Sequence, residues 1–467
     1  MNASPCALWW LQRDLRLADH PALHHAARAG LWLLPLYIDD PATREGAAAR
    51  AWRQRSLHAL DARLREHGSR LHCLQGDAAA QLARVAQHTN ATAVLSGLPV
   101  GAAEIAQHGR VQTALREAGA ALWRFNTHRL FDGEFPRTKA GDAYKVFTPY
   151  WNAARGQLKP PRWIREPLPL PALVKIDDGL TPAALAMAAT PAWDHGFWAE
   201  WTPGEAAAQQ RLDHFIQHAL DGYASTRDLP AIDGSSRLSP HLHFGELSPW
   251  RIVQAARATD AGEGASSFIK ELGWREFAHD VLLNFPHTER DNFNPRFDDF
   301  DWAAPDAARI SAWQQGRTGI PMVDAGMRQL WHTGWMHNRL RMIVGSFLCK
   351  HLRQHWRVGA AWFMDTLIDA DIANNTLGWQ WVAGTGVDAA PYFRVFNPVT
   401  QGQRFDPDGE YIARWLPPLA ALPAKLRHQP WLAEQHGLSP PAGYPAPIID
   451  LAAGREAALA AFAKIRR

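Results

Sequence analysis

Cysteine is scarce in this chain, and its three copies lie far apart. Cys6, Cys73 and Cys349 form no metal-binding spacing and no even set for disulfides, and they are too few for a four-cysteine iron–sulfur cluster. A long chain without a disulfide framework is typical of a reducing compartment, so we expect a cytoplasmic protein. His351 and His355 have the spacing of metal ligands on a helix, but no third ligand accompanies them, and we expect no metal site.

Several other signatures are also missing. The first residues show no signal-peptide pattern and no apolar run is long enough to span a bilayer, so we expect no association with membranes. The formal net charge is only +3, which is too weak to identify a nucleic-acid binder by charge alone. No G-x-S-x-G turn, phosphate-binding P-loop or zinc-deaminase signature occurs. The enzyme classes that depend on those motifs are therefore excluded.

Tryptophan, in contrast, is abundant, with 22 copies. Tryptophan fills hydrophobic cores, but so many copies also suggest stacking surfaces or electron relays. The length of 467 residues and the hydrophobic fraction of 47% predict a large core and more than one domain. Because the sequence shows no heptad pattern or exposed apolar stripe that would indicate a subunit interface, we expect a monomer.

The chain divides into an alternating part and a helical part. Short apolar runs at Ala7–Trp10, Leu31–Ile38, Arg70–Leu74 and Ala93–Ser96 alternate with helical patterns. This alternation predicts a Rossmann-like parallel sheet covered on both faces, which makes residues 1–130 an α/β domain. Residues 131–203 are predicted to be an interdomain connector, rich in proline and alanine over its later part. Residues 204–467 are predicted to be an all-α domain, with candidate helices at Glu205–Leu220, Pro249–Thr259, Ser266–Phe285, Ile320–Gly334, Asn338–His351 and Gly359–Ile368.

A cluster of serines lies where a helix of the second part can begin. Ser235, Ser236 and Ser239 follow Gly234 and precede Pro240. Hydroxyls and free backbone amides at a helix start form a cradle for an anion such as pyrophosphate. For the short motif alone, a plain serine cap is the simpler explanation.

A second group shares one face of a predicted helix. Glu271, Trp274, Arg275 and Ala278 stand at helical spacing. This combination suits a surface that stacks on a base, accepts a hydrogen bond from its edge and holds a phosphate. An amphipathic helix with an internal ion pair explains the same residues equally well.

Two further groups contain the charged residues of a candidate site. Asn338, Arg341 and Met342 share a helix face, although a core methionine and a surface arginine are the ordinary alternatives. Asp369 and Asp371 lie beside another helical run, and Arg341 is the natural partner of Asp369. Such a pair is costly to bury unless a function uses it.

Together the motifs resemble the photolyase/cryptochrome family over nearly the whole chain. The matching strings are WWLQRDLRLADHPAL near the start, then GSSRLSPHLHFGELS, ELGWREF, TGIPMVDAGMRQLWHTGWMHNRLRMI and DADIANNTLGWQWVAGTGVDAAPYFRVFNP in the helical part. Four long motifs in one order are a specific signal. The resemblance implies an N-terminal α/β antenna domain and a C-terminal helical domain that binds FAD.

The resemblance also implies roles for individual residues. Those implied to bind FAD are Tyr223, Ser235, Ser236, Arg237, Leu238, Ser239, Arg341, Asp369, Ala370, Asp371 and Asn375, with Asn375 facing the flavin N5. Those implied to bind DNA or the lesion are Arg227, Glu271, Trp274, Arg275, Asn338, Arg339, Met342, Trp381 and Gln401. Trp379, Trp356 and Trp302 resemble the tryptophans that carry an electron from the surface to the flavin, although the spacing around Trp302 departs by one residue from the family pattern. The implied catalytic set is Glu271, Asn375 and these three tryptophans.

Within the family, three positions favour repair of cyclobutane pyrimidine dimers in double-stranded DNA. Enzymes that repair (6-4) photoproducts resemble this chain but carry histidines where Asn338 and Met342 stand, and plant-type signalling cryptochromes usually carry Asp where Asn375 stands. The GWQW and WVAGTG motifs resemble those of a plant-cryptochrome-like branch of bacterial photolyases. A blue-light photoreceptor without repair activity therefore stays the alternative, and a flavin- or DNA-binding module without enzymatic activity is a third hypothesis.

The region that would bind an antenna chromophore has the fewest residues that match the family. In the segment after Ala93–Ser96, Glu104 is the only candidate ligand for a folate, and a solvated helix start explains it equally well. The family favours 5,10-methenyltetrahydrofolate, while a deazaflavin or an empty site stays open.

Overall fold

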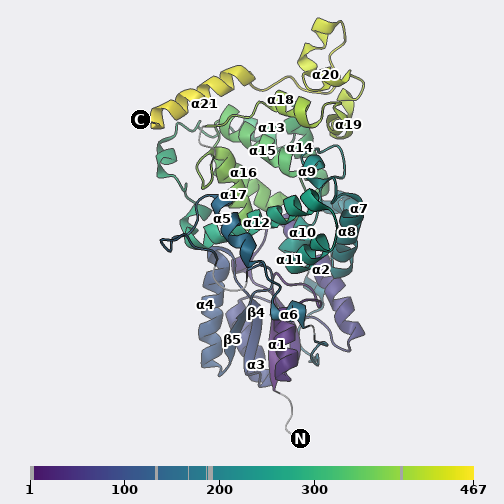
Figure 1. Cartoon of the computed structure of the whole chain (residues 1–467), viewed down its shortest axis with the longest axis vertical. Coiled ribbons are helices and arrows are strands. Elements are labelled where there is room, and N and C mark those ends of the chain that lie inside the picture. The colour runs from purple at the N-terminus through teal and green to yellow at the C-terminus, as the bar shows by residue number, and fades with distance from the viewer. Residues whose placement is uncertain are drawn as a thin grey trace.

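A computed structural model describes residues 5–131, 135–166, 168–185, 187, 193–389 and 393–466. A parallel β-sheet with its covering helices lies at one end of the molecule, and helices make up the remainder (Figure 1). The predicted fold class, an α/β part followed by an all-helical part, is confirmed.

The sheet has five strands in the order β3-β2-β1-β4-β5, and all neighbouring strands are parallel. The strands are β1 (Cys6–Leu11), β2 (Trp32–Asp39), β3 (His72–Gln75), β4 (Ala93–Gly97) and β5 (Ala121–Phe125), and the helices between them are α1 (Pro21–Ala29), α2 (Ala47–Glu66), α3 (Ala78–Thr89) and α4 (Gly101–Glu117). The first four strands coincide with the predicted apolar runs. The edge strand β5 was not predicted, because its side chains are exposed or only half-buried and it therefore has no buried apolar run.

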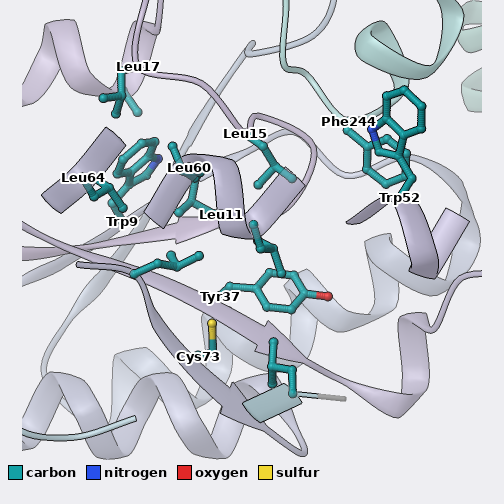
Figure 2. Packing of buried hydrophobic residues seen from close by; sticks show 14 of the residues in the cluster. Trp9, Leu11, Leu15, Leu17, Tyr37, Trp52, Leu60, Leu64, Cys73 and Phe244 are labelled. Carbon is teal, nitrogen blue, oxygen red and sulfur yellow. The ribbon is translucent and has the colours of Figure 1, made fainter. Parts of the chain in front are cut away.

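Alternate side chains of β1 enter two separate hydrophobic cores. Trp9 and Leu11 pack with residues of α1 and α2 on one face of the sheet, whereas Leu8 and Trp10 pack with residues of α3 and α4 on the other. Figure 2 shows part of the first core, where leucines of α2 lie beside Trp9. A two-residue period thus produces the doubly covered sheet.

The helical part docks closely onto the sheet. Phe244 stacks on Trp52 of α2, with ring centroids 6.1 Å apart (Figure 2), and Trp52 Nε1 donates to Glu246 at 3.0 Å. Gly245 has a φ of 63°, and a Cβ there would lie 2.0 Å from the carbonyl oxygen of Arg13. Only glycine permits this approach, so the two parts meet in a closely packed interface.

The helical part consists of many short helices around one long helix, α12, which contacts α5, α9, α11 and α17. Its helices are α7 (Phe197–Glu200), α8 (Glu205–His218), α9 (Tyr223–Thr226), α10 (Ser239–His243), α11 (Pro249–Arg257), α12 (Gly262–Asn284), α13 (Ala307–Gln314), α14 (Pro321–Thr333), α15 (Asn338–Ser346), α16 (Trp356–Thr366), α17 (Ile372–Ala383), α18 (Pro398–Phe405), α19 (Glu410–Trp415), α20 (Ala424–Arg427) and α21 (Leu451–Ile465). A π-helical turn, Phe347–His351, follows α15 directly. The six predicted helices are present, with shifts of a few residues at their ends.

The predicted connector contains more structure than its composition suggests. It includes α5 (Phe147–Ala154) and α6 (Arg162–Arg165), and α5 packs against α12. Farther along, Leu173 forms a bridge with Leu33 of β2 and Leu180 forms one with Cys73 of β3. The segment therefore contacts both parts, and its predicted limits of 131 and 203 stay predictions.

Two of the expected absences concern helices that could span a membrane and side chains that could hold a metal ion. Within the described ranges, no helix is both long enough and apolar enough to cross a bilayer. Over the same residues, no group of three or more histidine, cysteine, aspartate or glutamate side chains is arranged to hold a metal ion.

Candidate functional site

An ion pair between α15 and the segment before α17 lies at the centre of the candidate site. Arg341 donates from Nη2 to both carboxylate oxygens of Asp369, at 2.7 and 3.0 Å, and from Nε to the carbonyl of Met336 at 2.8 Å. The Asp369 side chain is 3% exposed, whereas that of Arg341 is 25% exposed. The predicted pair therefore forms, and its guanidinium keeps an open side on which a ligand could lie.

Asp371 is the N-cap of α17 and the most strongly stabilised carboxylate of the site. It accepts from the backbone amide of Asn374 at 2.9 Å and from Arg13 Nη1 at 3.3 Å, and the His279 and His243 rings lie 3.5 and 3.9 Å away. Burial alone would raise the pKa of Asp371, but the neighbouring His279, Arg13 and His243 hold it well below its usual range. This carboxylate therefore stays ionised at neutral pH.

Asn375 lies one turn farther along α17 and is held by the preceding helix, α16. Its Nδ2 donates to the carbonyl of Ala360 in α16 at 3.0 Å. The buried Ala370 separates Asp369 from Asp371 in the chain. The guanidinium, the two carboxylates and the amide thus come from α15 and from the first turns of α17 with the residues before it, and both α15 and α16 contact α17.

The three tryptophans of the implied electron relay lie in or against one hydrophobic cluster. Trp379 packs so closely on α16 that a Cβ at Gly359 would lie 2.0 Å from its ring. Trp356 is buried at the start of α16 and donates from Nε1 to Asn292 at 2.8 Å. Trp302 is half-buried, which gives the group one member that solvent can reach. Their roles stay predictions.

The serine cluster occupies the segment before α10, as the sequence suggested. Ser235 and Ser236 are half-buried, and the Ser236 hydroxyl accepts from the amide of Leu238 at 3.4 Å. Ser239, the first residue of α10, accepts from Trp335 Nε1 at 3.2 Å. Arg237 has a left-handed φ of 53°, and its guanidinium lies over the Trp201 ring at 4.4 Å. The segment is therefore a specifically shaped turn and more than a serine cap.

Tyr223 begins α9 and packs edge-on against Phe215 and Phe268, with centroids 5.5 and 5.3 Å away. One turn later, Arg227 forms an ion pair with Glu271 of α12. Both side chains of this pair are about one-quarter exposed, at 23% and 27%. The two residues implied to contact DNA and lesion therefore contact each other across the rim of the site.

Trp274 and Arg275 are adjacent on α12 but have different surroundings. Trp274 is half-buried and stacks on Phe147 of α5, with centroids 3.7 Å apart and an interplanar angle of 11°. Arg275 donates to the carbonyl of the buried residue His128 at 2.6 Å, and only 13% of its side chain is exposed. Arg275 therefore links α12 to the segment after β5. Its contact with the DNA backbone, which the family resemblance implies, stays a prediction.

The start of α15 presents three of the implied lesion contacts. Asn338 is exposed and Met342 is half-buried one turn later. Arg339 pairs with Asp228 at 2.7 Å and lies over the Phe405 ring at 4.1 Å. Arg227 and Asp228 of the segment after α9 thus anchor α12 and α15 side by side.

Trp381 and Gln401 are the remaining residues implied to contact the lesion or the DNA. Trp381 lies in the last turn of α17 and Gln401 in α18, and both are half-buried. Residues 390–392 of the intervening motif lie outside the described residues.

A small hollow that opens to solvent lies at the carboxyl end of the sheet. Its lining includes residues that follow β1 and β2 and the first turns of α4, among them Glu104. The Glu104 carboxylate is 15% exposed and accepts from Arg13 at 2.7 and 2.9 Å and from the amide of Val100 at 2.8 Å. It therefore lies at a helix start, as one of the two interpretations expected, and contact with a folate stays a prediction.

Three residues of the site were missed from the sequence. Arg13, His243 and His279 all face Asp371, although only Arg13 and His243 lie within the quoted motifs. Arg13 is separated from Asp371 by 358 residues, so no local spacing could identify the contact. The repeated charged residues in WWLQRDLR are the one signal that could have drawn attention to it.

The donor set fits an FAD molecule. A flavin ring alternates hydrogen-bond donors and acceptors along its polar edge, and this site offers a guanidinium from α15 with two carboxyl groups and an amide from α17 and the residues just before it. The Nδ1 atom of His279, a residue beside Asp371, is buried without a partner in the described structure. An unpaired buried nitrogen is costly, so its presence favours an additional bound group or a water here.

Comparisons with known proteins agree with this geometry. Residues 7–172 match the family model described as DNA photolyase, and residues 268–464 match the FAD binding domain of DNA photolyase. A deoxyribodipyrimidine photo-lyase of Agrobacterium fabrum is 41% identical, with 98% of each chain covered. Cryptochrome-2 of Arabidopsis thaliana is 33% identical over 98% of this chain and 78% of its own length. The crystal structure of a bacterial class III photolyase from Agrobacterium tumefaciens superimposes with a TM-score of 0.92 at 39% identity, covering 100% of this chain and 98% of the other.

Proposed function

Because the chain belongs to the photolyase/cryptochrome family, we propose that it is a deoxyribodipyrimidine photo-lyase that splits cyclobutane pyrimidine dimers in double-stranded DNA. When bound, FAD would supply a light-driven electron to the dimer and would take an electron back once the cyclobutane ring has opened, so that the splitting involves no net oxidation or reduction. The observation that carries the proposal is the Arg341–Asp369 pair, a nearly buried carboxylate holding a guanidinium that is still open on one side.

Each residue near that pair has a proposed part in holding the cofactor. Arg341 stabilises negative charge on the reduced ring, and Asp369 fixes its orientation. Asp371 and Asn375 face the polar edge. The segment Ser235 to Ser239 and Tyr223 hold the phosphates, since hydroxyls and free amides of a tight turn suit oxyanions. Ala370 keeps the backbone compact between the two carboxylates.

The rim of the site is proposed to receive the lesion. The dimer must leave the duplex, which costs a few kcal/mol and less where the lesion already distorts the helix. Stacking on Trp274 and Trp381 offsets this cost by roughly 1–3 kcal/mol for each base. Glu271 accepts from the pyrimidine edge, and Asn338 and Met342 shape the pocket.

The outer rim is proposed to hold the DNA backbone. Arg227, Arg339 and Gln401 come from three different elements, and two of them are guanidiniums suited to phosphate. Each arginine is paired with a carboxylate in the structure, so DNA binding exchanges one anionic partner for another. This arrangement predicts affinity that decreases as salt increases.

The proposal is tested with the purified protein and ultraviolet-treated duplex DNA. The absorption spectrum should contain flavin bands, and blue light should remove dimers from the DNA only when the protein is present and reduced. Absence of flavin from the purified protein, or dimers that persist under illumination, would overturn the proposal. The dark reaction of the same sample is the control.

Similarity to plant cryptochromes supports blue-light signalling as a second candidate. Cryptochrome-1 of Arabidopsis thaliana is 34% identical over 96% of this chain and 68% of its own length. Asn375 and the residues at the lesion rim favour repair instead. A protein that binds flavin and responds to blue light, but leaves dimers intact, would support the signalling function.

We further propose an antenna site, a cellular location, an oligomeric state and domain limits. The hollow beside Glu104 is the proposed antenna site, with 5,10-methenyltetrahydrofolate favoured over a deazaflavin. An absorption spectrum of the purified protein with bands beyond those of its flavin separates these from an empty site. The three cysteines are free, which suits the proposed cytoplasmic location. We also propose a monomer with an antenna domain at 1–130 and a catalytic domain at 204–467.

A further inference from the structure

The ring of His355 lies between two tryptophans of the implied electron relay. Its centroid is 4.8 Å from that of Trp302, with an interplanar angle of 50°, and 5.6 Å from that of Trp356, with an angle of 34°. Tilted contacts at these distances are within the range of favourable aromatic pairs. The sequence predicted no histidine neighbour for either tryptophan. It drew attention to His355 only through its helical spacing from His351.

From this stacking we propose that His355 bridges the electron step between Trp302 and Trp356. The inference rests on the proposed function, because it assumes that these tryptophans form a relay. In the step, an oxidised Trp356 gains one electron from Trp302, no bond forms or breaks, and a thiol in solution then reduces Trp302. The electron passed inward serves to reduce light-excited flavin.

The hydrogen bonds around His355 keep its ring neutral and fixed. His355 is the N-cap of α16, and its Nδ1 accepts from the amide of Arg357 at 3.2 Å. The ring proton is therefore on Nε2. Burial, aided by the nearby Arg357, lowers the pKa of His355 to about 4, while Asp298 has a smaller opposite effect. A neutral ring adds no positive charge beside a transient tryptophan radical cation, so it does not oppose the step electrostatically.

The two tryptophans are suited to the ends of this bridge. Trp356 is 1% exposed and held by Asn292, whereas Trp302 is half-buried and donates from Nε1 to the carbonyl of Phe297 at 3.3 Å. Solvent therefore reaches the outer ring and not the inner one. Electron transfer weakens steeply when saturated material or solvent replaces an aromatic ring between donor and acceptor.

Two substitutions at His355 distinguish the effect of losing the aromatic ring from the effect of losing the N-cap hydrogen bond. His355→Asn keeps a side chain that caps helices well and removes the ring, whereas His355→Phe keeps a ring and removes the cap. In protein loaded with oxidised FAD, we measure Trp302 radical formation by transient absorption and flavin photoreduction under blue light with dithiothreitol. We expect His355→Asn to slow both by an order of magnitude and His355→Phe to stay near wild type.

Two further measurements distinguish failure of the bridge from failure of the tryptophan relay or of the repair reaction. Repair of dimers by pre-reduced protein should be unchanged in both variants, because the relay only recharges the flavin. Wild-type photoreduction in His355→Asn, or equal slowing in both variants, would overturn the bridge. Trp356→Phe tests the relay itself: if it photoreduces normally, the proposed roles of the tryptophans fail, and the bridge fails with them.

Discussion

At the scale of single residues, the proposed role of Glu271 in repair can be measured directly. Its carboxylate pairs with Arg227 at the rim and has no other described partner, so the pair can open when DNA arrives. Glu271→Gln keeps the size of the side chain and removes its charge. A hydrogen bond to a charged group contributes about 1.5–3 kcal/mol, so we expect the repair quantum yield to decrease by roughly tenfold.

The measurement compares dimers repaired per absorbed photon in fully reduced protein. Glu263→Gln is the matched control, because Glu263 is an exposed glutamate in the first turn of the same helix and should leave the yield unchanged. A wild-type yield in Glu271→Gln would remove this residue from the proposed reaction.

His351 provides a prediction about pH at the same scale. It is 3% exposed in the π-helical turn, and burial lowers its pKa from 6.5 to about 4. The unfolded chain therefore takes up a proton between pH 6.5 and 4 that the folded chain does not, and stability decreases as pH is lowered through this window. We expect His351→Gln to make this decrease smaller, by at most about 3 kcal/mol.

Chemical denaturation at pH 7 and at pH 4.5 measures the effect. His436→Gln should leave the pH dependence as it is in the wild type, because His436 is exposed. An unchanged pH dependence in His351→Gln would show that the buried imidazole is not a source of the acid sensitivity.

At the scale of helices, the contact between α16 and α17 determines where Trp379 lies. A Cβ at Gly359 would approach the Trp379 ring to 2.0 Å, whereas one at Gly345 of α15 would stay 3.4 Å away. We expect Gly359→Ala to lower the free energy of unfolding by about 1–3 kcal/mol, because the ring or a helix must move. Gly345→Ala should be neutral or stabilising by up to about 1 kcal/mol, since alanine is the better helix former.

Urea denaturation of both variants, with flavin photoreduction as a second measurement, distinguishes these cases. The displaced ring in Gly359→Ala should also slow photoreduction. Equal stability of the two alanine variants would mean that the helices separate more easily than the packing suggests.

At the scale of the whole molecule, Arg13 connects the sheet to the cofactor site. It lies just after β1, is 11% exposed and pairs with Glu104 of α4 as well as with Asp371 of the helical part. Removing one member of a buried charge network costs about 3–5 kcal/mol, because its partners are left uncompensated. We expect Arg13→Met to lower stability by that amount and to weaken retention of FAD.

The control is Arg84→Met, which breaks an exposed pair with Asp178. Its side chains are 49% and 37% exposed, so its loss should change stability by less than about 1 kcal/mol. Thermal unfolding and the flavin content of the purified proteins measure both effects. If Arg13→Met resembled Arg84→Met, the Arg13 network would not be a source of the stability of the contact between the two parts.

Local patterns in the sequence determined most of the elements. A buried strand such as β1 and an amphipathic helix such as α14 each produce a characteristic period, and caps or prolines limit their ends. The Arg341–Asp369 pair was also predictable, because both residues stand in long motifs with specific spacing. Strand β5 was not, since an exposed edge strand shows no buried alternation.

Only the tertiary structure decided which distant residues meet. Arg13 reaches Asp371, Arg275 turns to the carbonyl of His128, and His355 lies between two tryptophans. The sequence by itself determined the two-part architecture and the chemical types present, because periodicity and motifs are encoded along the chain. The partners of each charged or aromatic side chain depend on how helices pack against one another, and that packing is a property of the whole fold.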